Sequence, residues 1–501
     1  MRVIFIAAEC EPWAKVGGLG DVVDALARAL GRVPGLLDEP VEVFLPGYRS
    51  VSVPERPAPP ELPLTVVDPG APRGSAAVTV RSLDASGYRL RLVDHPPAFD
   101  RDGLYGDGPE EFRDNARRFA LLARTALEAR RAEGRPIDVI ALHDWHACSA
   151  AILRDLVYAD DPVVGGAAVA LTIHNLAYQG WTPRDQVGQL GLGDDPPIGD
   201  AWGVDLLREG IRRAEAINTV SPGYASEALR PEGGMGLDGD LRARGEAFTG
   251  ILNGLDQDIW DPATDRAIAA PFDAADRAGK AACRADLCAR VGLDPADPAP
   301  ILGVIGRLDP QKGFDLVADA APGMVASGGR LVVLGSGDPA IADRLREAAA
   351  LHPDSVAVRE TFDRDLARRI YAGSDLFLMP SRFEPSGQSQ MIAMRYGTPP
   401  VARRTGGLAD TILDAHEDPG AGTGFLFDEA TPDALRFACE RAIAVLRDPD
   451  RTRWDGLVRR GMAVDWDWAR SSAPAYVAMF RRAIAARRVA MTTMDAGAPP
   501  G

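Results

Sequence analysis

Short apolar runs recur along the chain, and most are followed by a polar loop and then by a segment with helical spacing. The clearest runs lie at residues 2–8, 138–142, 167–173, 216–220, 301–305, 331–334 and 375–379. Apolar runs of this length, bounded by glycine and polar residues, predict buried strands. Strands that alternate with helices predict an α/β fold with parallel sheets.

The pattern restarts after residues 250–262, a turn-rich stretch that we interpret as a hinge. Because 501 residues are too many for one hydrophobic core, we predict two domains, residues 1–252 and 253–465. Residues 466–490 are predicted to form a terminal helix, and residues 491–501 a disordered tail.

Some segments receive a more local prediction. Residues 51–75 are rich in proline and lack periodicity, which predicts an irregular insertion, whereas residues 76–93 predict two short strands. A helix is expected over residues 107–133. Another is expected over residues 21–30, directly after a glycine-rich loop, with Asp21 near its N-cap.

One strand–loop–helix segment carries the densest chemistry. The run at residues 375–379 leads into the loop Met379-Pro-Ser-Arg-Phe-Glu-Pro-Ser-Gly-Gln-Ser-Gln-Met391, and a helix is expected over residues 390–396. Backbone amides in such a loop suit an anion, whereas the carboxylate of Glu384 suits sugar hydroxyls. The predicted ligand is therefore a sugar phosphate or a nucleotide sugar; an ordinary connecting loop is the alternative.

The basic residues have an unusual composition. Of 56 lysine and arginine residues only three are lysine: Lys15, Lys280 and Lys312. In a chain that uses arginine elsewhere, lysine is expected where a compact ammonium is needed, although chance survival is the alternative. Lys15 and Lys312 stand beside glycines in loops and are predicted to reach an anion. Lys280, in a helix expected over residues 277–291, is predicted to be a surface residue.

Charge and cysteine content exclude several classes of partner. The net charge of −16 and the pI near 5.0 argue against nucleic acid and against an anionic membrane surface. No apolar run approaches the roughly 18 residues of a membrane span. The five cysteines lack the spacing of a metal site, so a reduced, cytoplasmic protein is expected.

Several motifs occur in order along almost the whole chain. They are Lys15-Val-Gly-Gly-Leu-Gly-Asp-Val-Val23, His143-Asp-Trp-His146, Thr172-Ile-His-Asn-Leu-Ala-Tyr-Gln-Gly180, Ile251-Leu-Asn-Gly-Leu-Asp256 with Trp260-Asp-Pro-Ala-Thr-Asp265, Gly306-Arg-Leu-Asp-Pro-Gln-Lys-Gly313, and the Glu384 loop with Arg403-Arg-Thr-Gly-Gly-Leu-Ala-Asp410. Together they resemble the bacterial glycogen synthase and plant starch synthase family. The resemblance implies two Rossmann-like domains facing an interdomain cleft (the GT-B arrangement), with the C-terminal helix crossing back to the first domain. It also implies glucose transfer from ADP-glucose to the non-reducing end of an α-1,4-glucan, with retention of anomeric configuration.

The resemblance further implies residue roles. Arg307 and Lys312 match the diphosphate-binding pair, His174 the histidine beside the transferred glucose, and Glu384 the carboxylate that binds glucose hydroxyls; these four are predicted to be catalytic. Further contacts with the donor or acceptor are expected from Lys15, Gly17, Gly18, Asp21, Asp144, Asn253, Ser386, Gly387, Ser389, Thr405, Gly406 and Gly407. No metal or other cofactor is implied, since cationic side chains and backbone amides offset the charge of the diphosphate.

The chain departs from the family pattern within the Glu384 loop. Ser386 stands where the family commonly has cysteine, Gln388 where it has leucine, and Ser389 where it has threonine. Gln388 lies near the expected donor, so the choice between ADP and UDP stays open. The alternatives are a related retaining glycosyltransferase that uses UDP-glucose or a smaller acceptor, and a catalytically weak glucan-binding protein. A nicotinamide oxidoreductase is excluded because G-x-G-x-x-G is absent.

Overall fold

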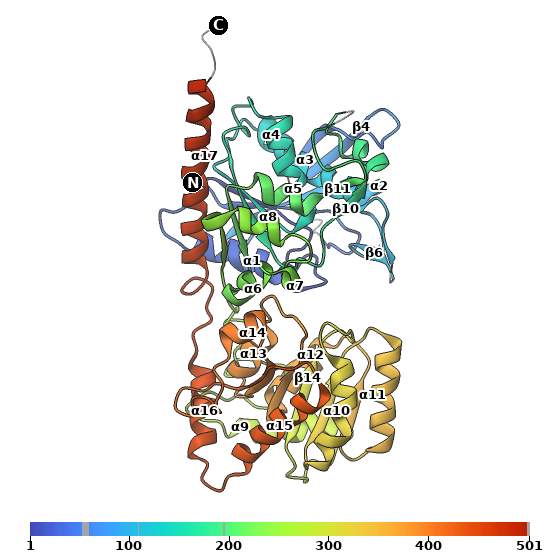
Figure 1. Ribbon diagram of the computed structural model, residues 1–501, viewed down its shortest axis with the longest axis vertical. Coiled ribbons are helices and arrows are strands. Elements are labelled where there is room, and N and C mark those ends of the chain that lie inside the picture. Colours follow the sequence, from blue (N-terminus) through green and yellow to red (C-terminus); the bar gives the residue numbers. More distant parts are fainter. Residues whose placement is uncertain (53–59, 109, 194–195, 498–501) are drawn as a thin grey trace. The chain divides into compact units, whose positions relative to one another are not determined.

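The computed structural model describes residues 1–52, 60–108, 110–193 and 196–497 and contains two compact units (Figure 1). Unit 1 comprises residues 1–220, 225–254 and those from Trp468 onward, and unit 2 comprises residues 221–224 and 255–467. Each unit is built on a largely parallel sheet, which confirms the expected α/β class. The change of unit after Gly254 falls in the stretch interpreted as a hinge.

The sheet of unit 1 has nine strands among the described residues, in the order β13-β12-β9-β8-β1-β2-β5-β4-β3. Pairing is parallel from β13 to β5 and antiparallel from β5 to β3. The strands are β1 (Val3–Ile6), β2 (Val41–Pro46), β3 (Glu61–Val67), β4 (Ser75–Ala85), β5 (Tyr88–Asp94), β8 (Val139–His143), β9 (Ala168–Ile173), β12 (Ala216–Thr219) and β13 (Phe248–Gly250). The inner parallel strands are buried on both faces, which explains their continuous apolar runs.

The longer helices of unit 1 are α1 (Gly18–Gly31), α3 (Asn115–Ala132), α4 (Ser149–Leu156), α5 (Leu206–Arg213) and α17 (Ala473–Gly497). Helix α17 packs against α1, β8, β9 and β12 of this unit, as the resemblance implied (Figure 1). Its bounds differ from the prediction. It begins after Ser472, whose hydroxyl donates to Leu252 O at 2.6 Å, and it continues through residues 491–497, which were expected to be disordered. Residues 498–501 lie outside the described residues.

Two other segments of unit 1 correct the sequence interpretation. Strand β3 occupies part of residues 51–75; it is an edge strand, where Pro63 is tolerated because its missing N–H faces away from the ladder. Residues 53–59 of that insertion lie outside the described part. Helix α3 begins only at Asn115, because β6 (Gly106–Asp107) and β7 (Glu110–Glu111) pair as a two-stranded ribbon before it.

The sheet of unit 2 is wholly parallel, in the order β16-β15-β14-β17-β18-β19. Its strands are β14 (Ile301–Ile305), β15 (Arg330–Leu334), β16 (Val356–Arg359), β17 (Leu376–Met379), β18 (Pro400–Arg403) and β19 (Phe425–Phe427). Its helices include α9 (Gly279–Val291), α10 (Phe314–Ala326), α11 (Pro339–Leu351), α12 (Arg364–Gly373), α13 (Ser389–Arg395), α14 (Gly406–Thr411), α15 (Pro432–Arg447) and α16 (Thr452–Ala463).

Strand order reverses next to β14 in unit 2 and next to β1 in unit 1. Strand β14 pairs with β15 on one side and with β17 on the other, and β1 pairs with β2 and β8 in the same way. Open α/β sheets bind ligands outside the carboxyl ends of the strands at such a switch point. The fold therefore brings the loops after β14 and β17 together, and likewise the loops after β1 and β8.

Lys280 is not a surface residue, contrary to the prediction. Its Nζ atom donates to Ala372 O at 3.0 Å, to Tyr396 O at 2.9 Å and to Thr398 Oγ1 at 2.7 Å. Two of these acceptors lie at the C-terminal ends of α12 and α13, where a cation is favourable because the last carbonyls lack intrahelical donors. Burial lowers the pKa of the ammonium to about 8. Lys280 therefore holds three helices of unit 2 together.

Candidate active site

The candidate residues of unit 2 come from the segments after β14, β17 and β18. Lys312 Nζ lies 2.6 Å from Glu384 Oε2, and Ser381 Oγ donates to the same oxygen at 3.0 Å. The Glu384 side chain is buried, so its carboxylate is fixed by these two donors. The structure thus brings together the lysine and the carboxylate that the sequence analysis paired with one ligand.

Arg307 shares the β14 loop with Lys312. Asp309 organises this loop, since its Oδ1 accepts from Lys312 N at 2.8 Å and its Oδ2 lies 3.3 Å from Arg307 Nη2. Gly313 ends the loop with φ of 73°, and a Cβ there would lie 2.2 Å from Pro380 O. The glycine therefore lets the β14 loop lie directly against the β17 loop, while 55% of the Arg307 side chain stays exposed to solvent.

The segment Thr405–Gly407 packs directly against the backbone of the Glu384 loop. Gly407 N donates to Glu384 O at 3.0 Å. A Cβ on Gly406 would lie 2.1 Å from Glu384 O, and one on Gly407 would lie 2.2 Å from Ser386 O. Both glycines are thus required by the close approach of two backbone segments. The Gly407 amide, expected to contact the ligand, is used within the protein.

The Ser386–Ser389 turn is also held from within. Gln390 Nε2 donates to Ser386 O at 3.0 Å and to Gly387 O at 3.2 Å, and Gly387 has φ of 68°. Tyr371 OH donates to Ser389 Oγ at 3.0 Å. Sequence reasoning missed Tyr371, because no local motif links it to a serine 18 residues later.

In unit 1, His174 is fixed by the loop after β8. Its Nε2 lies 3.0 Å from His143 Nδ1, and its backbone N–H donates to Asp144 Oδ1 at 2.6 Å. Asn175 N donates to the same oxygen at 3.4 Å. Asp144 therefore fastens the His174 loop to the β8 loop and does so with φ of 57°, a strained backbone conformation for an aspartate.

Burial sets the charge of this cluster. It lowers the pKa of His174 to about 3 and that of His146 to about 3, so both rings are neutral at pH 7. Burial also raises the pKa of Asp144 to about 7, even though its backbone donors favour the ionised form. A neutral histidine suits a hydrogen bond to a hydroxyl better than the binding of an anion.

The Lys15 loop is organised by an acid that the sequence analysis did not single out. Glu9 Oε2 accepts from Val16 N at 2.7 Å and from Gly17 N at 2.9 Å, and Tyr105 OH donates to Glu9 Oε1 at 2.6 Å. The Gly17 amide, expected to reach a diphosphate, thus donates to Glu9. The available signal was the position of Glu9 at the carboxyl end of β1.

Lys15 itself is paired with Asp21, at 2.5 Å between Nζ and Oδ1. Helix α1 begins at Gly18, earlier than predicted, so Asp21, expected near the N-cap, lies in its first turn. Burial raises the pKa of Asp21, and Lys15 opposes this effect. Asn253 is buried in unit 1, and its Oδ1 atom has no hydrogen-bond partner within the described structure.

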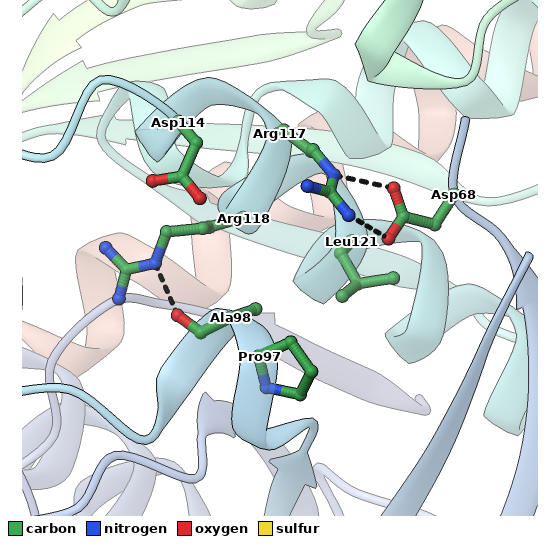
Figure 2. A pocket seen from close by; sticks show the side chains of 7 residues that line it. All are labelled: Asp68, Pro97, Ala98, Asp114, Arg117, Arg118 and Leu121. Carbon is green, nitrogen blue, oxygen red and sulfur yellow. Dashed lines mark hydrogen bonds and ion pairs between the residues drawn. The ribbon is translucent and has the colours of Figure 1, made fainter. Parts of the chain in front are cut away.

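A small pocket of unit 1 lies elsewhere, between α3 and α2 (Pro96–Phe99) (Figure 2). Arg117 donates twice to Asp68, at 2.7 Å each, and Arg118 donates to Ala98 O at 2.6 Å. Arg118 also faces the rings of Phe99, Phe112 and Phe119. None of the predicted site residues lines this pocket, whose polar groups tie the surrounding loops together.

Two further properties concern the described residues alone. They contain no group of three or more histidine, cysteine, aspartate or glutamate side chains placed to hold a metal ion. None of their helices combines the length and the apolar character that crossing a membrane requires.

Two Rossmann-like units, each with cationic and hydrogen-bonding side chains at its switch point, are typical of GT-B glycosyltransferases. The chain matches the family described as starch synthase catalytic domain over residues 2–243, and glycosyl transferases group 1 over residues 299–444. A glycogen synthase from Anaeromyxobacter dehalogenans is 45% identical, with 96% of this chain and 99% of the relative covered. One from Syntrophotalea carbinolica is 41% identical, with 97% and 99% covered.

Solved structures agree with these relatives. The catalytic domain of starch synthase IV from Arabidopsis thaliana, bound to ADP and acarbose, has a TM-score of 0.86 and 34% identity, with 97% of this chain and 99% of that chain covered. Sucrose-phosphate synthase from Thermosynechococcus elongatus shares the fold, with a TM-score of 0.58 at 19% identity and coverage of 97% and 99%. The chain belongs to the glycogen synthase and starch synthase family of glycosyltransferases.

Proposed function

We propose that the protein transfers glucose from ADP-glucose to the non-reducing end of an α-1,4-glucan, with retention of anomeric configuration. The observation that carries the proposal is the contact between Lys312 and the buried carboxylate of Glu384 at the switch point of unit 2. An ammonium beside a fixed carboxylate suits a ligand that is anionic at one end and rich in hydroxyls at the other. The relative with bound ADP and acarbose supports this choice of ligand chemistry.

The roles in unit 2 follow from where charge develops. As the bond between the glucose carbon and the diphosphate oxygen breaks, negative charge grows on the departing diphosphate. Lys312 and Arg307 offset that charge, and they accelerate the reaction to the extent that they bind the transition state more tightly than the bound donor. Glu384 accepts hydrogen bonds from glucose hydroxyls. The acceptor hydroxyl forms the new bond to the glucose carbon, and its proton leaves with the ADP.

The roles in unit 1 rest on hydrogen bonding and on one cation. His174, neutral and held by His143 and Asp144, is assigned to a hydroxyl of the transferred glucose. Lys15, held by Asp21, is the corresponding cation of this unit, and its assignment to the donor diphosphate is part of the proposal. No metal enters the proposal, so the rate in excess EDTA should equal the rate without it. A loss of activity that Mg²⁺ restores would contradict this mechanism.

The decisive experiment measures nucleotide release from ADP-glucose and from UDP-glucose, each with and without glycogen, together with incorporation of labelled glucose into the glucan. We expect ADP release that depends on glycogen and labelled glucose at the chain ends. Preference for UDP-glucose would overturn the donor assignment, and nucleotide release without glucan labelling would overturn the acceptor.

A further inference from the structure

A buried tyrosine of unit 2 donates a hydrogen bond to a serine of the candidate site. Tyr371 lies near the C-terminal end of α12, and its OH donates to Ser389 Oγ at 3.0 Å. Ser389 is the first residue of α13 and is half-buried, so its hydroxyl is the more accessible of the two. A buried phenol needs a hydrogen-bond partner, and here that partner belongs to the candidate site. The contact therefore joins the core of unit 2 to that site.

The Tyr371 side chain is fixed by its neighbours. Its ring centroid lies 5.9 Å from that of Trp260, 5.0 Å from that of Phe377 and 6.3 Å from that of Tyr396. Its backbone is held as well, because Thr398 Oγ1 donates to Tyr371 O at 2.6 Å. The phenolic oxygen is thus kept in one place. It can therefore fix the orientation of a serine hydroxyl that would otherwise rotate.

The direction of this hydrogen bond decides what Ser389 can offer to a ligand. A serine hydroxyl has one proton and two lone pairs. Because Tyr371 donates to Ser389 Oγ, one lone pair is occupied and the serine proton points elsewhere. A phenol is also the stronger acid of the two hydroxyls, which favours this direction. Ser389 is thereby set up as a donor, and a phosphate oxygen is a strong acceptor for such a proton.

We propose that Tyr371 is a positioning residue that orients the Ser389 hydroxyl, so that the serine donates its proton in a hydrogen bond to the diphosphate of the nucleotide sugar; this rests on the proposed function. Arg307 and Lys312 offer cations from the segment after β14, whereas Ser389 adds a neutral donor from the segment after β17. Helices α12 and α13 are in contact, so the packing between them sets the orientation of this donor.

The test measures ADP binding by isothermal titration calorimetry. Tyr371→Phe keeps the ring and removes only the hydroxyl, so the fold should be retained. The dissociation constant for ADP should rise about two- to tenfold, the range expected when one hydrogen bond is lost. Ser389→Ala should weaken ADP binding at least as much. In the Ser389→Ala background, Tyr371→Phe should have no further effect, because the tyrosine acts through the serine hydroxyl.

Tyr396→Phe is the matched control. Tyr396 belongs to the same aromatic cluster, but its OH donates to Asp265 Oδ2 at 2.5 Å and not to a residue of the candidate site. Its affinity for ADP should stay within about twofold of the parent, whatever happens to its melting temperature. Unchanged ADP affinity in Tyr371→Phe would overturn the proposal. So would equal losses from Tyr371→Phe with and without the serine hydroxyl.

ADP binding is measured without glucan, which separates this proposal from the proposed function. If the variants bind ADP as expected but no glucose reaches glycogen, the assignment of Tyr371 stands and the proposed function fails. Binding of UDP in place of ADP would correct the donor, and the same variants would then be compared with UDP, which carries the same diphosphate. Binding of neither nucleotide to the parent protein would overturn both proposals.

Discussion

Lys280→Ala is expected to destabilise unit 2 strongly. The substitution removes the donor of three hydrogen bonds that converge on one ammonium. Thr398 keeps a bond through its own hydroxyl proton, which it donates to Tyr371 O at 2.6 Å, so the loss falls mainly on Ala372 O and Tyr396 O. A buried acceptor left unpaired costs about 1–3 kcal/mol.

Two such acceptors give roughly 2–6 kcal/mol, and relief from burying a charge offsets part of this cost. A net loss of about 2–3 kcal/mol in the free energy of unfolding remains. For a unit of about 200 residues, each kcal/mol lowers the melting temperature by about 2–4 °C. We therefore expect the unfolding transition of unit 2 to fall by about 5–10 °C in calorimetry at pH 7.

Two variants separate the ammonium from other effects. Lys280→Met keeps the apolar stem and should melt nearly as low as Lys280→Ala. Arg290→Ala lies on the same helix, but the Arg290 side chain is exposed and forms a surface ion pair with Asp286 at 3.4 Å, so the variant should shift the transition by less than about 1 °C. If Lys280→Ala and Arg290→Ala have the same melting temperature, the Lys280 ammonium does not hold the three helices together.

Three further predictions concern the candidate active site. Lys312→Ala should lower kcat by about 10²–10³ with little change in donor KM; a change in KM alone would show uniform binding instead. As the pH falls from 7 to 4, the free energy of unfolding of Asp144→Asn should decrease relative to that of the parent by up to about 1.4 kcal/mol per pH unit, measured by urea unfolding. The sign follows because the raised pKa of Asp144 destabilises the fold above pH 7, and protonation removes that cost as the pH falls; parallel curves for variant and parent would refute it. Gly406→Ala should lower both melting temperature and activity, since its Cβ would meet Glu384 O, whereas Gly420→Ala, in an open turn, should change neither.

The chemistry at the ends of β14 and β17 could be predicted because buried parallel strands appear as continuous apolar runs. The residues that follow such a run, Lys312 and Glu384 among them, must then lie at one edge of the sheet. What could not be predicted depends on distant partners. The acceptors of Lys280 lie 92 to 118 residues further along the chain, and Glu9 meets Tyr105 across 96 residues. No periodicity or local motif reports contacts at such separations.

The position of α17 has a consequence for how the chain folds during synthesis. Unit 1 contains the first strand, β1, and also α17, whose sequence is translated only after all of unit 2. The sheet of unit 1 therefore lacks its covering helix α17 until more than 200 residues of unit 2 have left the ribosome. Unit 2 has its last residue before α17 and can fold first, even though it is made second. A released chain that ends before residue 473 should accordingly hold a native unit 2 and a unit 1 that still binds chaperones.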